Sequence, residues 1–133
     1  MFGWFKQDKD TQFARAVYGL NRGFPYKSEK YEILFSVPMC ITRGGGDCDD
    51  KADMWHCVLK AMGFDPKVVH GYYGRTNHAA VICRIGQKEF VFCNAARKVM
   101  ESQYYLKNKM RNYKILTDKE YKEWRLSHAV DRV

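Results

Sequence analysis

The chain has 133 residues, of which 46% are hydrophobic and 29% charged, and its formal net charge is +8. This length and composition predict a single globular domain over residues 1–133 and argue against a disordered protein or one that spans a membrane. The basic balance favours acidic partners, although the basic residues are dispersed and no nucleic-acid motif is visible.

The first 46 residues predict two short helices and a loop. Asp10 and Thr11 are suited to cap a helix within residues 7–21, and a second short helix is expected over residues 28–35. Three consecutive glycines, residues 44–46, then allow the backbone to turn sharply.

The stretch after the glycines organises the rest of the chain. Asp49 and Asp50 suit the positive end of a helix dipole, and apolar residues recur at helical spacing until Gly63, where the helix should end. Cys48 therefore falls at the helix N-terminus, where the dipole and free N–H groups favour thiolate over thiol. The neighbouring aspartates oppose this bias. A reactive Cys48 thus needs a positive partner, most naturally a histidine.

The second half of the chain predicts a small sheet followed by helices. The segments expected to be strands are residues 67–73, 79–85 and 89–94, the last two forming a hairpin around Gly86-Gln87. The remainder is expected to be helical, with Thr117 and Glu120 forming a capping box for the last helix. The fold class is therefore α+β, with a central cysteine-bearing helix packed on a small antiparallel sheet and further helices at both termini.

Among the four histidines, His78 is the best-placed base for Cys48, because it follows a polar loop at the start of a strand. A base works better when a third polar group fixes its tautomer, and Asn94 ends the partner strand. Register decides whether the two meet, since side chains alternate between faces. A two-residue turn puts Cys93 on the face of His78, whereas a three-residue loop through Lys88 puts Asn94 there. The spacing leaves both registers open.

Five ordered motifs within residues 43–97 resemble the core of the transglutaminase-like superfamily, thiol enzymes with a papain-like fold. They are Gly46-Asp47-Cys48, Leu59-Lys60-Ala61-Met62-Gly63, Val69-His70-Gly71-Tyr72, His78-Ala79 and Phe90-Val91. The resemblance implies a catalytic triad of Cys48, His78 and Asn94, in which Asn94 stands where the superfamily has an aspartate. An asparagine accepts a hydrogen bond from an imidazole but supplies no negative charge, so the resemblance also implies altered activity.

The resemblance implies a thiol enzyme acting on an amide bond in a protein, peptide or other substrate, and the charge balance favours an acidic one. A thioacyl intermediate on Cys48 would go to water in a cysteine peptidase or amidase, or to an amine in a transglutaminase-type acyl transfer. Asp47, Asp50 and Asn77 are candidate substrate-binding residues. From a different class, the chain could be a catalytically silent papain-fold module that binds an acidic partner through its basic C-terminal half, where basic residues are most concentrated over residues 107–114.

The five cysteines show no C-x-x-C pair, and the N-terminus shows no export signal, so we expect free thiols and a cytoplasmic location. Cys57, Cys83 and Cys93 lie in apolar periodic segments and are expected to be buried. A zinc site of Cys48, His78 and Cys93 is an alternative, but the close-spaced ligand pair is missing. We therefore expect no metal and no cofactor.

Overall fold

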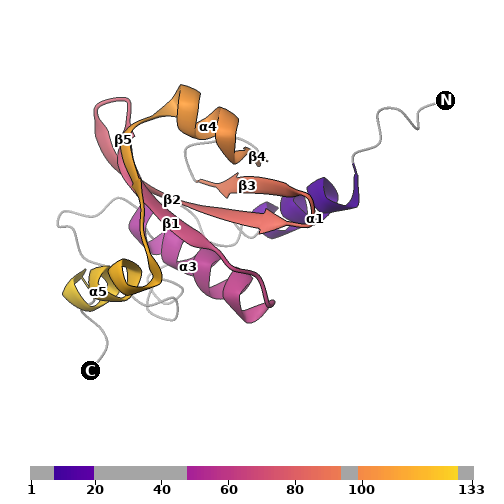
Figure 1. The fold of residues 1–133 in the computed structure, drawn as a ribbon, viewed down its shortest axis with the longest axis horizontal. Helices are drawn as coiled ribbons and strands as arrows, with labels where there is room; N and C mark the ends of the chain where they lie inside the picture. Colours follow the sequence, from indigo (N-terminus) through magenta and orange to yellow (C-terminus); the bar gives the residue numbers. More distant parts are fainter. Residues whose placement is uncertain (1–7, 20–47, 94–98, 129–133) are drawn as a thin grey trace.

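The fold is that of a computed structural model, which describes residues 8–19, 48–93 and 99–128. An antiparallel sheet in the order β4-β3-β2-β1-β5 carries helices on both faces (Figure 1). The strands are β1 (Lys67–Tyr73), β2 (Thr76–Ile85), β3 (Lys88–Phe92), β4 (Met100–Glu101) and β5 (Met110–Ile115). The helices are α1 (Lys9–Tyr18), α3 (Cys48–Ala61), α4 (Ser102–Lys109) and α5 (Asp118–His128). None of these described helices is both long and apolar enough to cross a membrane. The short helix expected over residues 28–35 lies outside the described residues.

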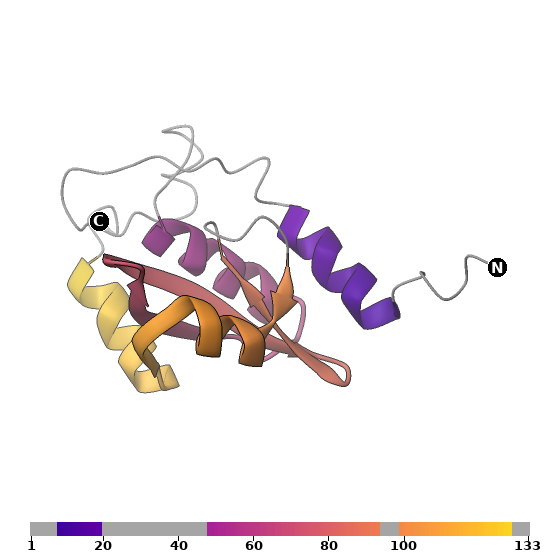
Figure 2. The ribbon, with the colours of Figure 1, turned by 90° about the horizontal axis from the view of Figure 1, so that it is seen from above.

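Helix α3 packs on one face of the sheet, mainly against β2 (Figure 2). It begins at Cys48, as predicted, and carries Asp49 and Asp50 in its first turn. Gly63 follows the helix with a φ of 92°, a conformation that glycine adopts without strain, and this confirms the predicted stop. Trp55 and Leu59 are fully buried in the core that α3 shares with α1, α5 and the sheet.

Helix α4 lies on the opposite face of the sheet (Figure 2) and builds a second core. This core consists of Val69, Ala80, Ile82, Val91, Cys93, Tyr105, Leu106 and Met110, with Tyr73 and Met100 at its margin. Side chains along a strand alternate between faces, so His78 shares the α4 face with Ala80 and Ile82. The sheet is therefore buried on both sides, and His78 lies on the face that α4 covers, whereas Cys48 lies on α3 at the other face.

Helix α1 is tied to the turn between β2 and β3. Its N-cap is Asp8, whose carboxylate accepts a hydrogen bond from the Thr11 N–H at 2.8 Å, so the predicted cap at Asp10 and Thr11 is wrong. Asp8 also pairs with Lys88 at 2.7 Å, and the Asp10 carboxylate accepts from the Gln87 N–H at 3.2 Å. The first turn of α1 thus serves both as a cap and as an anchor on the hairpin.

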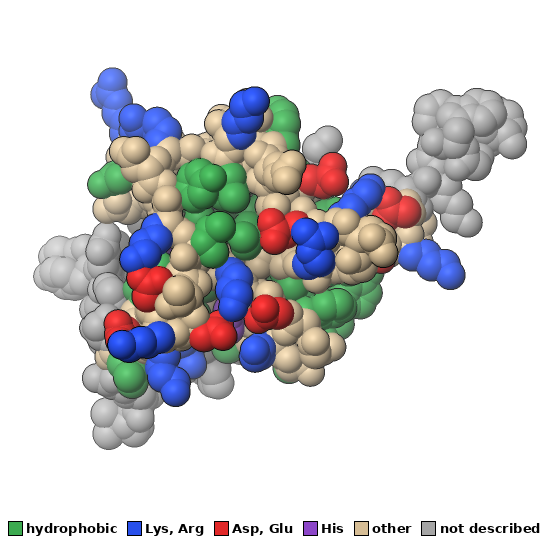
Figure 3. Space-filling view, in the orientation of Figure 1, with side chains coloured by type: hydrophobic (Ala, Val, Ile, Leu, Met, Phe, Trp, Pro, Cys, Tyr) green, Lys and Arg blue, Asp and Glu red, His purple; other side chains and the backbone are tan. Residues whose placement is uncertain are grey.

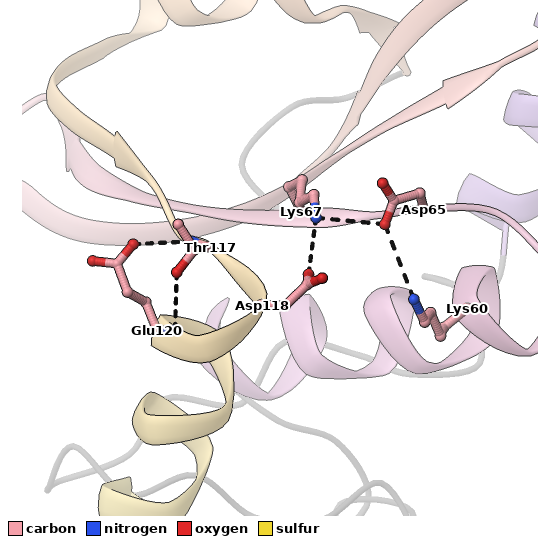
Figure 4. A network of polar contacts seen from close by, with 6 residues as sticks. All are labelled: Lys60, Asp65, Lys67, Thr117, Asp118 and Glu120. Carbon is pink, nitrogen blue, oxygen red and sulfur yellow. Dashed lines mark hydrogen bonds and ion pairs between the residues drawn. The ribbon is translucent and has the colours of Figure 1, made fainter.

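Helix α5 begins with the predicted capping box (Figure 4). The Thr117 N–H donates to the Glu120 carboxylate at 3.0 Å, and the Glu120 N–H donates to the Thr117 hydroxyl at 3.1 Å. Lys67 on β1 pairs with Asp118 at 2.8 Å and with Asp65 at 3.5 Å. These contacts fix the start of α5 beside the start of β1.

A buried carboxylate holds the middle of α5 against α3. Asp53 of α3 is 1% exposed, and its Oδ1 lies 3.0 Å from the Arg125 Nε and accepts a hydrogen bond from the Tyr121 hydroxyl. The ring of His56 stacks on Tyr121 at a centroid distance of 3.9 Å. A charge removed from water needs such partners, so this cluster orients α5.

Strand β5 was not predicted, because its segment was expected to be helical. It pairs with β1 as an edge strand, and five of its six residues are exposed. The two strands approach closely at Gly71, where a Cβ would lie 2.8 Å from the Tyr113 Cα. A bulge adjusts the register nearby, and Asn112 adopts a positive φ of 48°. Asparagine tolerates that conformation better than most residues.

Candidate active site

Polar and sulfur-bearing side chains meet at one end of the sheet. Because β2 and β3 are antiparallel, β2 begins where β3 ends, and His78 lies diagonally opposite Cys93 on the same face. Cys48 begins α3 at this end, and Tyr105 approaches from α4 on the other side. The site therefore combines two strands with the start of one helix and the flank of another.

The hairpin has the two-residue register. Ile85 pairs with Lys88, which leaves only two residues in the turn. The three-residue loop that the resemblance favoured is wrong, and the side chain that meets His78 is Cys93, with Nε2 and Sγ 2.7 Å apart. Asn94 lies outside the described residues, so its role as third member of a triad stays a prediction.

Cys48 is half-buried at the first position of α3. Its Sγ lies 3.9 Å from the Asp49 carboxylate, so the acidic first turn opposes the thiolate while the helix dipole favours it. Burial, followed by the charges of Cys93, Tyr73 and Cys48, raises the pKa of Tyr105. The Cys48 thiol is thus close enough to interact electrostatically with the phenol that contacts Cys93.

His78 is buried, with 8% of its surface exposed. Burial, reinforced by the charge of His70, lowers the pKa of His78 to about 4, so the imidazole is neutral at neutral pH. The Tyr73 ring lies beside it at a centroid distance of 5.5 Å. A neutral imidazole can accept a proton, as a general base must.

Cys93 is fully buried, and three side chains form hydrogen bonds with its sulfur or its carbonyl. In addition to His78, the Tyr105 hydroxyl donates a hydrogen bond to its Sγ at 2.8 Å. The Tyr18 hydroxyl, at the end of α1, donates to the Cys93 carbonyl at 3.0 Å. The expectation that Cys93 is buried is confirmed, but its surroundings are polar rather than those of a small hydrophobic residue.

A buried lysine completes this end of the sheet. Lys51 is 2% exposed, and burial lowers its pKa while the charge of Cys93 acts in the opposite direction. Sequence reasoning missed Lys51 and Tyr105. Lys51 lies three residues after Cys48, hence on the same helix face, and this spacing was an available signal. Tyr105 carries no such signal, because only the packing of α4 on the sheet brings it here.

The three candidate substrate-binding residues have different surroundings. Asp50 is 1% exposed, which suits a structural role at the start of α3 better than contact with a substrate. Asn77 is exposed on β2, next to His78, and faces Tyr72 across the strand pair. Asp47 lies outside the described residues. Asn77 is therefore the described candidate that solvent reaches.

The other cysteines differ from Cys48 in their surroundings. Cys83 is buried as expected, but Cys57 is half-buried because it lies at the margin of the Asp53 cluster, and that expectation is wrong. Burial raises the pKa of both thiols. Within the described ranges, no three His, Cys, Asp or Glu side chains are arranged to hold a metal ion, and this includes Cys48, His78 and Cys93.

A cysteine-bearing central helix on a small antiparallel sheet, with a histidine at the same sheet end, defines a papain-like, transglutaminase-core fold.

Among solved structures, LapG from Legionella pneumophila has this fold, with a TM-score of 0.67 and 14% identity over 91% of this chain and 76% of LapG. Calcium-bound LapG has a TM-score of 0.64 and 15% sequence identity over 81% of this chain. EGTA-treated LapG has a TM-score of 0.62 and 15% sequence identity over 81% of this chain. This chain spans only 65% and 63% of the length of those two. No protein-family model and no characterised protein matches the sequence. At such low identity, the likeness shows the fold.

Proposed function

We propose that the protein is a thiol enzyme that cleaves an amide bond, with Cys48 as the nucleophile and His78 as the general base. The observation that carries this proposal is that a half-buried cysteine begins α3 at the end of the sheet where a buried, neutral histidine lies on β2. The transglutaminase-core fold supports it, because thiol enzymes of that superfamily carry their cysteine at this helix start.

The proposed reaction proceeds in two stages. Cys48 Sγ attacks the amide carbonyl carbon while His78 takes the thiol proton, and the backbone N–H of Cys48 stabilises the resulting oxyanion. The tetrahedral intermediate breaks its C–N bond, His78 returns the proton to the leaving amine, and a thioester remains on Cys48. Water then attacks the thioester, His78 again relays the proton, and the acid and free thiol are released. If an amine attacks instead, the product is a new amide.

The third member of this machinery is proposed from the superfamily pattern. Asn94 would accept a hydrogen bond from the His78 ring and hold it in one orientation. The hydrogen-bonding partner that the structure describes for the His78 ring is Cys93, the residue before Asn94. Asn94 therefore enters the proposal as a prediction from the resemblance alone.

We propose an acidic protein, peptide or other amide as the substrate, because the chain carries a net charge of +8. On the face drawn in Figure 3, basic side chains are interspersed with acidic ones, so attraction is expected to be general rather than focused on one patch. We also propose a reducing, cytoplasmic setting, since the four described cysteines are free thiols and the mechanism needs one.

The proposal is tested with a pool of peptides prepared from a digested proteome. The peptides are incubated with the protein and with Cys48→Ala, with or without a primary alkylamine, and the products are read by mass spectrometry. We expect new peptide termini that disappear in Cys48→Ala but persist in the Cys57→Ala control. Hydrolysis leaves a new carboxylate, whereas acyl transfer attaches the added amine. Products that survive in Cys48→Ala would contradict the proposal.

The silent-module alternative gives a different result in the same experiment. The exposed basic residues Lys107, Lys109 and Arg111, on α4 and β5, are the observation that favours it. A silent module would yield no products but would bind an acidic polymer such as polyglutamate, and charge reversal at these three positions would weaken that binding. The enzyme proposal instead predicts that charge reversal leaves the Cys48-dependent products in place.

A further inference from the structure

We infer that Cys93, held by Tyr105, is the positioning residue for His78, in the place where the superfamily pattern has a carboxylate. The inference rests on the proposed function, because the orientation of His78 matters only if its ring exchanges a proton with Cys48. It departs from the sequence prediction, which gave this place to Asn94.

The contacts around the sulfur are direct and shielded from water. Sγ of Cys93 lies 2.7 Å from the His78 Nε2 and 2.8 Å from the Tyr105 hydroxyl. Cys93 and Tyr105 have no exposed surface and His78 has 8%, so solvent does not compete for these contacts. The Tyr18 hydroxyl holds the Cys93 carbonyl at 3.0 Å, which fixes the backbone on the opposite side. The sulfur is therefore held between β2 and α4, and α1 holds the backbone of the same residue.

The inference requires one tautomer of the histidine, and the contact with Cys93 is compatible with it, because the sulfur can accept a hydrogen bond from Nε2–H. The Tyr105 hydroxyl donates to Cys93 Sγ, which makes the sulfur an acceptor, and the pKa of Tyr105 is raised by burial, so the phenol keeps its proton. If His78 also donates, through Nε2–H, its Nδ1 carries a lone pair and can take a proton from Cys48. In the opposite tautomer Nδ1 carries the hydrogen and cannot act as a base. Cys93 thus has the role that a carboxylate or carboxamide has in related thiol enzymes.

The charges nearby suit a sulfur that accepts hydrogen bonds. Lys51 is buried on α3, and its positive charge interacts with Cys93. A cation and a phenol O–H both stabilise negative charge on sulfur, which in turn would stabilise the imidazolium as it forms during the reaction. Among the described residues, the titratable groups that contact Cys93 or His78 or interact electrostatically with them or with Tyr105 are Tyr18, Cys48, Lys51, His70, Tyr73 and Tyr105.

The first test is nuclear magnetic resonance of the His78 ring nitrogens at neutral pH. We expect the wild-type ring to carry its hydrogen on Nε2, and this preference to be lost in Cys93→Ala and weakened in Tyr105→Phe. Cys93→Ser should retain it, because a hydroxyl still accepts from both donors and nearly preserves the volume. The serine variant also keeps the test open if the alanine variant does not fold. Cys83→Ala, a buried cysteine on the same sheet, is the control.

The second test measures the pKa of His78 and the reactivity of Cys48. Cys93→Asp should raise the His78 pKa by about one unit or more, because an adjacent carboxylate favours the charged ring. Iodoacetamide should alkylate Cys48 roughly tenfold more slowly in Cys93→Ala than in the wild type, a small part of the ~10²–10⁴-fold that a positioned base supplies. Cys93→Ser should recover most of that loss, and the Cys83→Ala control should show none.

The results separate this inference from the proposed function. If the His78 tautomer and the Cys48 alkylation rate are unchanged in Cys93→Ala while peptide cleavage still requires Cys48, the enzyme stands and Cys93 is only a core residue. If Asn94→Ala changes the tautomer and Cys93→Ala does not, the third place belongs to Asn94. If cleavage does not require Cys48, the proposed function itself fails. The inference is supported only when the tautomer and the rate both depend on residue 93.

Discussion

Burial of His78 should make the stability of the protein depend on pH. The pKa of this imidazole is about 4 in the folded chain, against a value of about 6.5 for an exposed histidine. As pH falls, the unfolded chain therefore binds a proton before the folded chain does. The stability is complete above the unfolded pKa and is lost as pH decreases toward the folded pKa. When the pH falls from 7.5 to 5, a pKa shift of this size lowers the free energy of unfolding by about 2 kcal/mol.

The assay is urea unfolding followed by tryptophan fluorescence across that pH range. His78→Gln removes the titration but retains an amide that can donate to Cys93. We expect the loss of stability between pH 7.5 and 5 to be about 2 kcal/mol smaller in His78→Gln than in the wild type. His56 also has a pKa of about 4, mainly through burial, so the variant should keep a residual pH dependence. Identical pH dependence in the two proteins would refute the reasoning.

Two further predictions concern contacts that hold the fold, each measured as the free energy of unfolding in urea. Arg125→Ala removes the cation 3.0 Å from the buried Asp53 carboxylate and should cost about 1–3 kcal/mol; a change below about 0.5 kcal/mol would show that the carboxylate does not need it. Gly71→Ala puts a Cβ 2.8 Å from the Tyr113 Cα and should cost roughly 1–3 kcal/mol. Gly19→Ala, which meets only open space, should be neutral or stabilising by up to about 1 kcal/mol, and equal effects of the two glycine variants would contradict the close approach of β1 and β5.

The parts of the fold that sequence predicted well are those with local signals. Cys48 begins α3 because an acidic first turn follows it, and Gly63 ends the helix because its backbone needs a positive φ. The capping box of Thr117 and Glu120 involves residues three apart and needs no distant partner. Strand β1 has the predicted bounds, since its β-branched and aromatic residues favour an extended backbone.

Strand β5 escaped prediction because its stability comes from pairing with β1, about forty residues earlier in the chain. As an edge strand with exposed side chains, it shows no alternation of apolar and polar residues that would reveal it. The hairpin register did have a local signal. Gly86 has a φ of 66° at the first turn position, and a glycine there favours a two-residue turn. The resemblance to a superfamily outweighed that signal and led to the wrong register.

Competitive alkylation tests most directly whether Cys48 is a nucleophile that His78 activates. Wild type and His78→Gln are treated with limiting iodoacetamide at neutral pH, and labelling of the five cysteines is quantified by peptide mapping. We expect Cys48 to be alkylated faster than the other four in the wild type and to lose this advantage in His78→Gln. Equal labelling of all five, a preference for Cys40, or an unchanged Cys48 rate in His78→Gln would contradict the claim.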